Sequence, residues 1–266
     1  MFTTISKSSL VRGYRVSDAS RLRIGWMSAA LLAATIAMPG STMAAGVVLL
    51  ASNSPSLQTT PTPLGGATVA GVIPTPLTSG VTSLTLGYGG VKQGQLLIAD
   101  VMTYSGAAPA IQPPSGWQLI RDDISPTTRQ TLYSHVADSN EQPSAWTFSQ
   151  PVDSQGAILA LDNAAASDPI DGSSGIGGSQ AINAPALTAS DDGDLILVFF
   201  ATDFGGIAPG PDYPDDMLMI ANQKVDTHAY WILGSYQAKR GDLDEVNSPT
   251  PQLYNAAASQ VAIRRR

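Results

Sequence analysis

The chain has 266 residues, 43% of them hydrophobic and 13% charged, with a formal net charge of −7 and no cysteine. This length and hydrophobic fraction allow one large domain or two small ones without disulfides, and the missing cysteine excludes thiol catalysis and thiolate metal sites. Because charged residues are about half as frequent as in a typical soluble domain, and the chain holds 25 Gly and 19 Pro, the composition favours strands and turns over amphipathic helices.

Residues 1–45 have the pattern of a secretory signal peptide. An apolar run from Trp26 to Met38 is followed by Pro39-Gly40 and the small residues STMAA, and it is preceded by five basic residues: Lys7, Arg12, Arg15, Arg21 and Arg23. The run is short for a transmembrane helix, so we expect cleavage after Ala44 and a secreted, periplasmic or cell-surface protein. The alternative is an uncleaved anchor, the only membrane contact that the sequence suggests.

The predicted mature chain is strongly acidic. Residues 1–45 contain five basic residues and one acidic residue, so the 14 basic and 21 acidic residues of the chain become 9 and 20, a net charge of −11. Such a chain repels phosphate backbones, so we expect no nucleic-acid partner.

Residues 46–80 are predicted to hold an N-terminal strand, GVVLLASN at 46–53, and a linker rich in Pro, Thr and Ser. A strand on so long a tether has two possible partners. We expect it to pair with its own sheet. The alternative is β-strand addition to a neighbouring molecule, which would make it an assembly device.

The segment 81–266 contains an internal repeat, with halves at about 81–165 and 181–264. GQLLI from Gly94 matches GDLIL from Gly193, an offset of 99 residues. Three further matches follow in the same order, at offsets of 100, 101 and 103: PSGWQLI with PDDMLMI, TLYSHVA with ILGSYQA, and GAILAL with SQVAIR. Each half therefore predicts a unit of about four strands.

One such unit cannot bury its own apolar face, and two units packed together can. The sequence therefore predicts an all-β fold, a two-layer antiparallel β-sandwich of jelly-roll-like type with an internal pseudo-twofold repeat. The continuous apolar runs at 94–102 and 193–200 predict central strands buried on both faces. Their predicted core residues are Leu96, Ile98, Leu195 and Leu197.

Five segments also resemble a recurrent domain: GQLLIADV, PPSGWQLI (113–120), LYSHVADSNEQPSAWTF (132–148), DPIDG (168–172) and APALTASDDGDLILVFF (184–200). They are similar to the jelly-roll-like "GDLLI…PPSGWT" domain of bacterial secreted proteins and phage virion or tail proteins. The chain departs from it at Gln95, where that domain usually has Asp, and in a long insert at 53–80. The resemblance implies a surface-exposed or particle-associated module, and no catalytic residues carry over.

Acidic residues gather in the predicted loops 162–171, 190–194, 211–216 and 241–245. Carboxylates in loops at one end of a sandwich are hard oxygen ligands that can hold Ca²⁺, although Asp is also a common turn residue. The candidate calcium ligands are Asp191, Asp192, Asp194, Asp212, Asp215 and Asp216; otherwise we expect no cofactor.

Two features are candidates for ligand binding. Trp117 follows a Pro-Pro-Ser-Gly turn and is either a sugar-stacking platform or, as its match to the apolar Met217 favours, a core residue. Arg240 and Asp242 belong to an Arg-Gly-Asp tripeptide of the kind that integrin ligands present, which a Gly-Asp hairpin turn also explains.

The sequence contains no strong catalytic motif. Its only histidines, His135 and His228, are too few for a multi-His zinc site, and GSSGIGG (172–178) lacks the context of a phosphate-binding loop. We therefore expect a non-enzymatic surface or particle-associated module that binds glycan or protein or takes part in assembly. The alternative is a secreted glycan-active hydrolase with a carboxylate pair.

Overall fold

The structure is a computed structural model that describes residues 66–87, 89–106, 108–178, 183–203, 217–225, 227–236, 241–246 and 255–266. The predicted signal segment and the strand at 46–53 lie outside these residues. The described strands are β1 (Thr68–Leu86), β2 (Leu96–Tyr104), β3 (Ile111–Gln112), β4 (Gln118–Ile124), β5 (Thr128–Val136), β6 (Ser144–Asp162), β7 (Ile170–Gly178), β8 (Leu187–Ala189), β9 (Leu195–Asp203), β10 (Leu218–Val225), β11 (His228–Tyr236), β12 (Gly241–Leu243) and β13 (Asn255–Ile263). In this part of the chain, no helix is long and apolar enough to cross a membrane.

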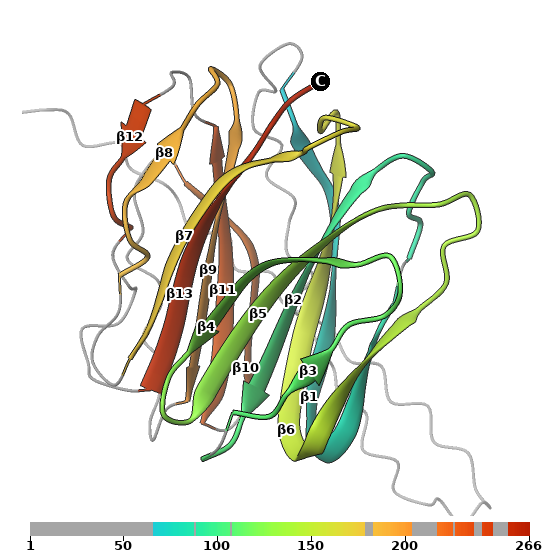
Figure 1. The fold of residues 1–266 in the computed structure, drawn as a ribbon, viewed down its shortest axis with the longest axis vertical. Coiled ribbons are helices and arrows are strands. Elements are labelled where there is room, and N and C mark those ends of the chain that lie inside the picture. Colours follow the sequence, from blue (N-terminus) through green and yellow to red (C-terminus); the bar gives the residue numbers. More distant parts are fainter. Residues whose placement is uncertain are drawn as a thin grey trace, which may run out of the picture. The chain divides into compact units, whose positions relative to one another are not determined.

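Two antiparallel sheets pack face to face (Figure 1). The first sheet has the strand order β1-β6-β2-β5-β4, with β3 paired to β6, and the second has the order β10-β11-β9-β13-β7. Each sheet takes its strands from one half of the chain. The prediction of an all-β, two-layer antiparallel sandwich with an internal repeat is therefore confirmed.

The two sheets have the same internal plan. If β1, β2, β4, β5 and β6 are matched with β7, β9, β10, β11 and β13, the strand orders become identical. Even the irregularities are repeated, since the β4–β5 ladder skips Ile120 and the β10–β11 ladder skips Ile220. Bulges at matching positions show that the halves share a backbone plan as well as a hydrophobic pattern.

Two of the four predicted repeat offsets were wrong by one residue. Leu96 pairs with Val136 and Leu161, whereas Leu195 pairs with Tyr236 and Ile263. The offset between β5 and β11 is therefore 100 rather than 101, and that between β6 and β13 is 102 rather than 103. A slip of one residue moves every side chain to the opposite face of a strand. Because these strands carry apolar residues on both faces, the alignment of the two halves did not reveal the slip.

The predicted linker also extended too far. Residues 68–80 belong to β1, whose first part pairs with β6 from Thr68↔Asp162 onward. The Pro and Thr residues in this stretch hid the strand, but β1 is an edge strand, where Pro is tolerated. The first half of the repeat therefore begins near residue 68, and the second begins with β7 at Ile170.

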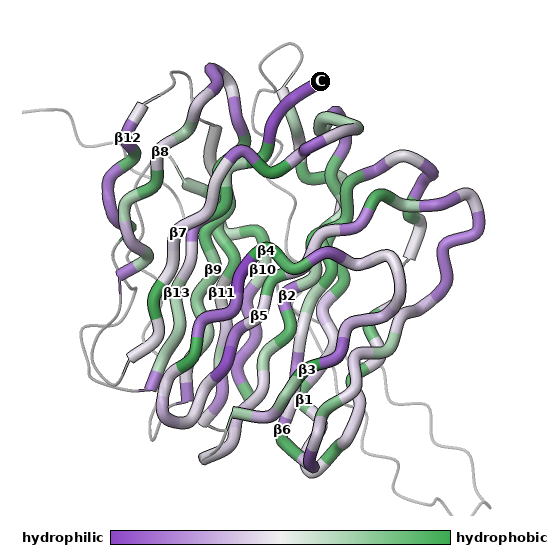
Figure 2. Tube along the Cα trace, in the orientation of Figure 1, coloured by the Kyte–Doolittle hydropathy of each residue, from purple (hydrophilic) through white to green (hydrophobic). Residues whose placement is uncertain are grey.

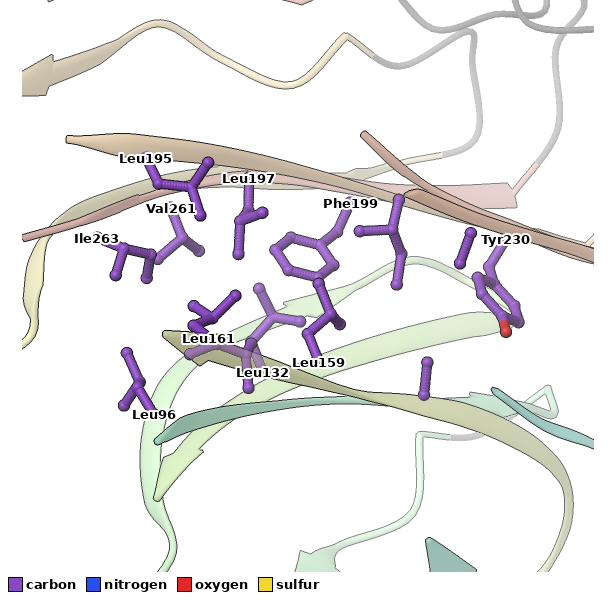
Figure 3. Packing of buried hydrophobic residues seen from close by; sticks show 14 of the residues in the cluster. Leu96, Leu132, Leu159, Leu161, Leu195, Leu197, Phe199, Tyr230, Val261 and Ile263 are labelled. Carbon is purple, nitrogen blue, oxygen red and sulfur yellow. The ribbon is translucent and has the colours of Figure 1, made fainter. Parts of the chain in front are cut away.

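The main hydrophobic core lies between the two sheets. Figure 3 shows Leu96, Leu159 and Leu161 of the first sheet facing Leu195, Leu197 and Phe199 of the second. The four predicted core residues Leu96, Ile98, Leu195 and Leu197 are all buried here. Their prediction is confirmed.

Each sheet also has an apolar outer face with its own cover. Leu97, Ala99 and Val101 of β2 pack beneath Trp146 and other residues of the β1–β6 ribbon, and the outer residues of β9 pack against β8 and β12. Every residue of β2 is buried for this reason, and β9 carries hydrophobic colour along most of its length in Figure 2. The two strands are central and buried on both faces, as the repeated apolar runs predicted.

The β1–β6 ribbon covers its own sheet because it bends. Its register shifts three times between Thr75 and Ser83. Gly80, with φ +64°, lies at this bend, and its N–H donates to Asp153 Oδ1 at 2.9 Å. In the second half the corresponding ribbon is divided, with β8 and β12 separate from β7 and β13.

The glycine-rich run of β7 has a packing role. A Cβ at Gly175 would lie 2.6 Å from Asp123 Oδ2, and one at Gly177 would overlap the main chain at Ile124. These glycines let β4 of the first sheet cross closely over β7 of the second. The run 172–178 therefore closes one side of the sandwich, through backbone contact that any larger residue would prevent.

Truncation of the matched core leucines tests the repeat. Leu96→Ala and Leu195→Ala should each lower the free energy of unfolding by about 2–5 kcal/mol, because each leaves a cavity between the sheets. Leu119→Ala is the control, since Leu119 is 60% exposed and surface changes usually stay within about 0.5 kcal/mol. Urea unfolding measures all three. Equal losses for Leu119 and the two core positions would contradict the packing described above.

Candidate functional site

One arginine gathers the acidic loops at one end of the sandwich. Arg264 directly follows β13, and its guanidinium forms ion pairs with three carboxylates: Asp168 at 2.5 Å, Asp171 at 2.7 Å and Asp191 at 3.3 Å. Asp168 lies in the β6–β7 turn, Asp171 in β7 and Asp191 in the β8–β9 turn. The Asp168 carboxylate raises the pKa of the Arg264 guanidinium above its usual value, so its positive charge is permanent.

Two of the neighbouring aspartates have opposite pKa shifts. Burial alone would raise the pKa of Asp171, but hydrogen bonds from Ser190 and Asp194 and the charge of Arg264 outweigh burial and lower it. For Asp194, burial raises the pKa to about 7, helped by contact with the Asp171 carboxylate and by the charge of Asp191. Two adjacent carboxylates that cannot both ionise divide their titrations in this way.

The geometry assigns the shared proton to Asp194. Its side chain is fully buried, and neither carboxylate oxygen accepts a hydrogen bond from the described residues. Asp171, in contrast, accepts hydrogen bonds from both the N–H and the hydroxyl of Ser190. Asp171 is thus held as the ionised partner, and the proton stays on Asp194.

A hollow of about 440 Å³ opens beside this pair. It is bounded by three aspartates and three arginines: Asp191, Asp192, Asp194, Arg264, Arg265 and Arg266. The side chain of Asp191 is 59% exposed, and Arg266 Nε donates to the Ala164 carbonyl at 3.2 Å. Carboxylates and guanidiniums therefore border the same hollow, and its floor includes a buried acid.

The site has a counterpart in the first half of the repeat. Gln95 and Asp162 occupy the register positions of Asp194 and Arg264, and Gln95 Nε2 donates to Asp162 Oδ1 at 2.9 Å. The fold thus places a polar pair beside the start of each central strand. In the first half the pair is an amide and a carboxylate. In the second it is an acid and a guanidinium, which gives the second half its charged hollow.

The structure brings together part of the predicted calcium set. Asp191, Asp192 and Asp194 border the hollow, whereas Asp212, Asp215 and Asp216 lie outside the described residues. The Arg264 guanidinium supplies to Asp168, Asp171 and Asp191 the positive charge that a Ca²⁺ ion would bring. Calcium binding by these loops stays a prediction.

The other predicted ligand-binding residues lie elsewhere. Trp117 is 7% exposed and packs edge-on against Trp146, with ring centroids 5.0 Å apart, so it does not present a face to solvent. Asp242 lies on β12, where its Oδ1 accepts a hydrogen bond from Thr188 Oγ1 at 2.7 Å. Arg240 lies outside the described residues.

A second polar group, Asp100 on β2, lies inside the main core. It faces the other sheet, and Gln130 Nε2 donates to its Oδ2 at 3.1 Å. Burial raises the pKa of Asp100 to about 8, which this hydrogen bond opposes in part. The carboxyl is therefore largely protonated at neutral pH, as expected of an acid held in an apolar interior.

Sequence reasoning missed Asp100, Asp171 and Arg264 as site residues. For Asp100 a signal existed, because a single acid interrupts the apolar run GQLLIADVM of a strand predicted to be buried on both faces. Arg264 and Asp168 are 96 residues apart, and no local pattern links them.

Comparison with known proteins identifies no relative: no protein-family model, curated protein or solved structure matches the chain. The resemblance to the "GDLLI…PPSGWT" domain therefore stays a prediction.

The Asp171–Asp194 pair predicts a pH dependence of stability. Because folding raises the pKa of Asp194 from 3.8 to about 7, its contribution to stability is full below pH 3.8 and is lost as the pH rises through 7. Asparagine keeps a donor toward Asp171 at every pH. Asp194→Asn should therefore reduce the fall in unfolding free energy between pH 4 and 7.

Asp244→Asn is the matched control for this measurement. It removes the same charge from an exposed position and should leave the slope unchanged. Urea unfolding at several pH values measures both variants. The assignment of the proton to Asp194 is refuted if Asp194→Asn keeps the wild-type slope. The contribution of Asp171 changes at lower pH. Because folding lowers the pKa of Asp171 from 3.8, the stability that this residue contributes is lost as the pH falls below 3.8.

Proposed function

We propose that this chain is an exported, non-enzymatic β-sandwich module that binds a neutral, hydroxyl-rich glycan in the Asp–Arg hollow, at a cell surface or on a particle. The observation that carries the proposal is the border of the hollow, where three aspartates and three arginines meet. A volume of about 440 Å³ is in the usual range of small-ligand sites.

The mixture of charges favours an uncharged ligand. The carboxylates of Asp191 and Asp192 repel an anion, and the three arginines repel a cation, whereas the protonated Asp194 adds no negative charge. A sugar hydroxyl both donates and accepts hydrogen bonds, so it can donate to a carboxylate and accept from a guanidinium at the same time. The guanidinium of Arg265 forms no ion pair with a described residue and is available for such a contact.

The site and the predicted location are consistent with each other. The n-region and h-region of residues 1–45 support export, and the glycans of cell surfaces lie outside the cytoplasm. Among the side chains whose burial the structure describes, no large aromatic residue is exposed. We therefore infer recognition by polar contacts rather than by ring stacking, which implies modest affinity for each sugar unit.

One observation favours a second function, glycan hydrolysis. Asp194 borders the hollow, and its pKa of about 7 lets it act as a general acid near neutral pH. However, its contact with Asp171 leaves no space for a glycosidic bond between the two carboxyl groups, which glycosidases usually place about 5–10 Å apart. Binding without turnover is therefore the better-supported proposal.

A glycan array of neutral oligosaccharides, followed by titration calorimetry with the best ligand, tests the proposal. We expect binding that the double variant Asp191→Asn/Arg265→Gln weakens at least tenfold, because both kinds of polar partner are lost. The control Asp244→Asn/Lys224→Gln changes the same charges at exposed positions away from the hollow and should bind like the wild type.

Three outcomes decide between the functions. Absence of binding across the array, or equal binding by the double variant, overturns the proposal. Release of new reducing ends by the wild type but not by Asp194→Asn replaces it with hydrolysis. The proposal is supported if the wild type binds a glycan without turnover and the double variant binds it more weakly.

A further inference from the structure

A cluster of three metal-ligating side chains lies at the end of β5. His135 is near the end of that strand, and Asp138 and Glu141 follow in the turn to β6. One ring nitrogen and two carboxylate oxygens from these residues lie within 4.8 Å of one another. None of the three borders the Asp–Arg hollow, so this cluster is separate from the proposed glycan site.

The His135 ring is oriented as in a metal ligand. Its Nδ1 lies 3.2 Å from the Gly116 carbonyl oxygen, so Nδ1 is the protonated nitrogen and donates to this carbonyl. Histidines that bind metals usually donate their second nitrogen to a carbonyl or carboxylate in this way. The lone pair of Nε2 then points toward Glu141 Oε2, 3.1 Å away.

Two neighbours hold the ring in this position. Trp117 packs against His135 with ring centroids 5.2 Å apart and is itself anchored on Trp146. Gly116, at φ +87°, brings its carbonyl to the ring, and a Cβ at this residue would lie 3.4 Å from His135 Cε1. The PPSGW turn, whose Trp117 the sequence favoured as a core residue over a sugar platform, thus supports a histidine.

One separation between ligand atoms, that between His135 and Glu141, already fits a small divalent ion. In a tetrahedral zinc site, metal bonds of about 2.0–2.2 Å place adjacent nitrogen and oxygen ligands about 3.3 Å apart, close to the 3.1 Å between His135 Nε2 and Glu141 Oε2. Without a cation or a proton between them, a nitrogen lone pair would face a carboxylate oxygen, which is unfavourable. Asp138 is exposed, and its carboxylate can complete a set of three protein ligands.

We propose that His135, Asp138 and Glu141 bind one divalent first-row transition-metal ion, of which Zn²⁺ is the representative. One imidazole and two carboxylates with further positions open to water suit this class better than Ca²⁺, which prefers six to eight oxygen ligands. The second half of the repeat has Ser235 at the register position of His135. The metal site therefore belongs to one half only, and it goes beyond the proposed glycan binding.

Titration calorimetry with Zn²⁺ alone, in a buffer that does not chelate it, tests this site on the full chain. We expect one ion per chain, with Ca²⁺ binding more weakly. His135→Gln and Glu141→Gln should each weaken Zn²⁺ binding by tenfold or more. Asp138→Asn should also weaken it, and because Asp138 is exposed, its loss separates metal binding from misfolding.

His228→Gln is the matched control. It removes the other histidine, which lies 3.7 Å from Asp203 in a separate ion pair, and it should bind Zn²⁺ like the wild type. Replacement of Zn²⁺ by Co²⁺ gives a visible absorption spectrum as a second readout, which should disappear in His135→Gln. Circular dichroism of each variant verifies that it is folded.

Two results would overturn the proposal. One is the absence of Zn²⁺ binding by the wild type, which would leave His135 and Glu141 as a structural ion pair only. The other is binding that the three ligand variants leave unchanged. Loss of glycan binding in the hollow variants would not affect either readout, so the two proposals fail independently.

Discussion

The architecture depends on the burial of both faces of its two central strands. β2 and β9 are apolar on both sides, so a simple two-layer sandwich would leave one face of each in water. The chain meets this requirement with an additional cover on each sheet: the bent β1–β6 ribbon over β2, and β8 with β12 over β9. Three hydrophobic clusters result, where two packed sheets alone would have one.

Close contact between the sheets follows from the same requirement. The edge strand β4 crosses β7 where Gly177 leaves room for its backbone and Gly175 for its side chains, and β1 approaches β10. Edges that lie against the opposite sheet are less available to another molecule. In the described part of the chain, the edge strands of one sheet thus lie close to edge strands of the other, β4 to β7 and β1 to β10.

The charged groups of the two proposed sites lie where strands end, and Asp100 does not. Strand termini and turns hold Arg264, the Asp171–Asp194 pair and the His135 cluster. At these positions, solvent and dissolved ligands can reach the exposed side chains. Asp100 is the exception, because it is enclosed between the sheets with Gln130 as its hydrogen-bond donor. Because burial raises the pKa of Asp100 to about 8, the fold loses stability as the pH rises toward this value, which links stability to pH from inside the core as well as from the hollow.

The sequence by itself determined the central strands, the repeat and the regions where charge would gather. Alternation and apolar runs are local signals, so they identified β2 and β9, the core positions Leu96 and Leu195, and the acidic turns. Local signals did not determine the register of strand pairing. When both faces of a strand are apolar, a slip of one residue barely changes the hydrophobic pattern, and this led to the wrong offset between β6 and β13. Only the tertiary structure placed Arg264 among Asp168, Asp171 and Asp191, residues 73 to 96 positions away in the chain. Such pairs depend on which strand ends meet in space, and that is decided by the packing of the two sheets as a whole.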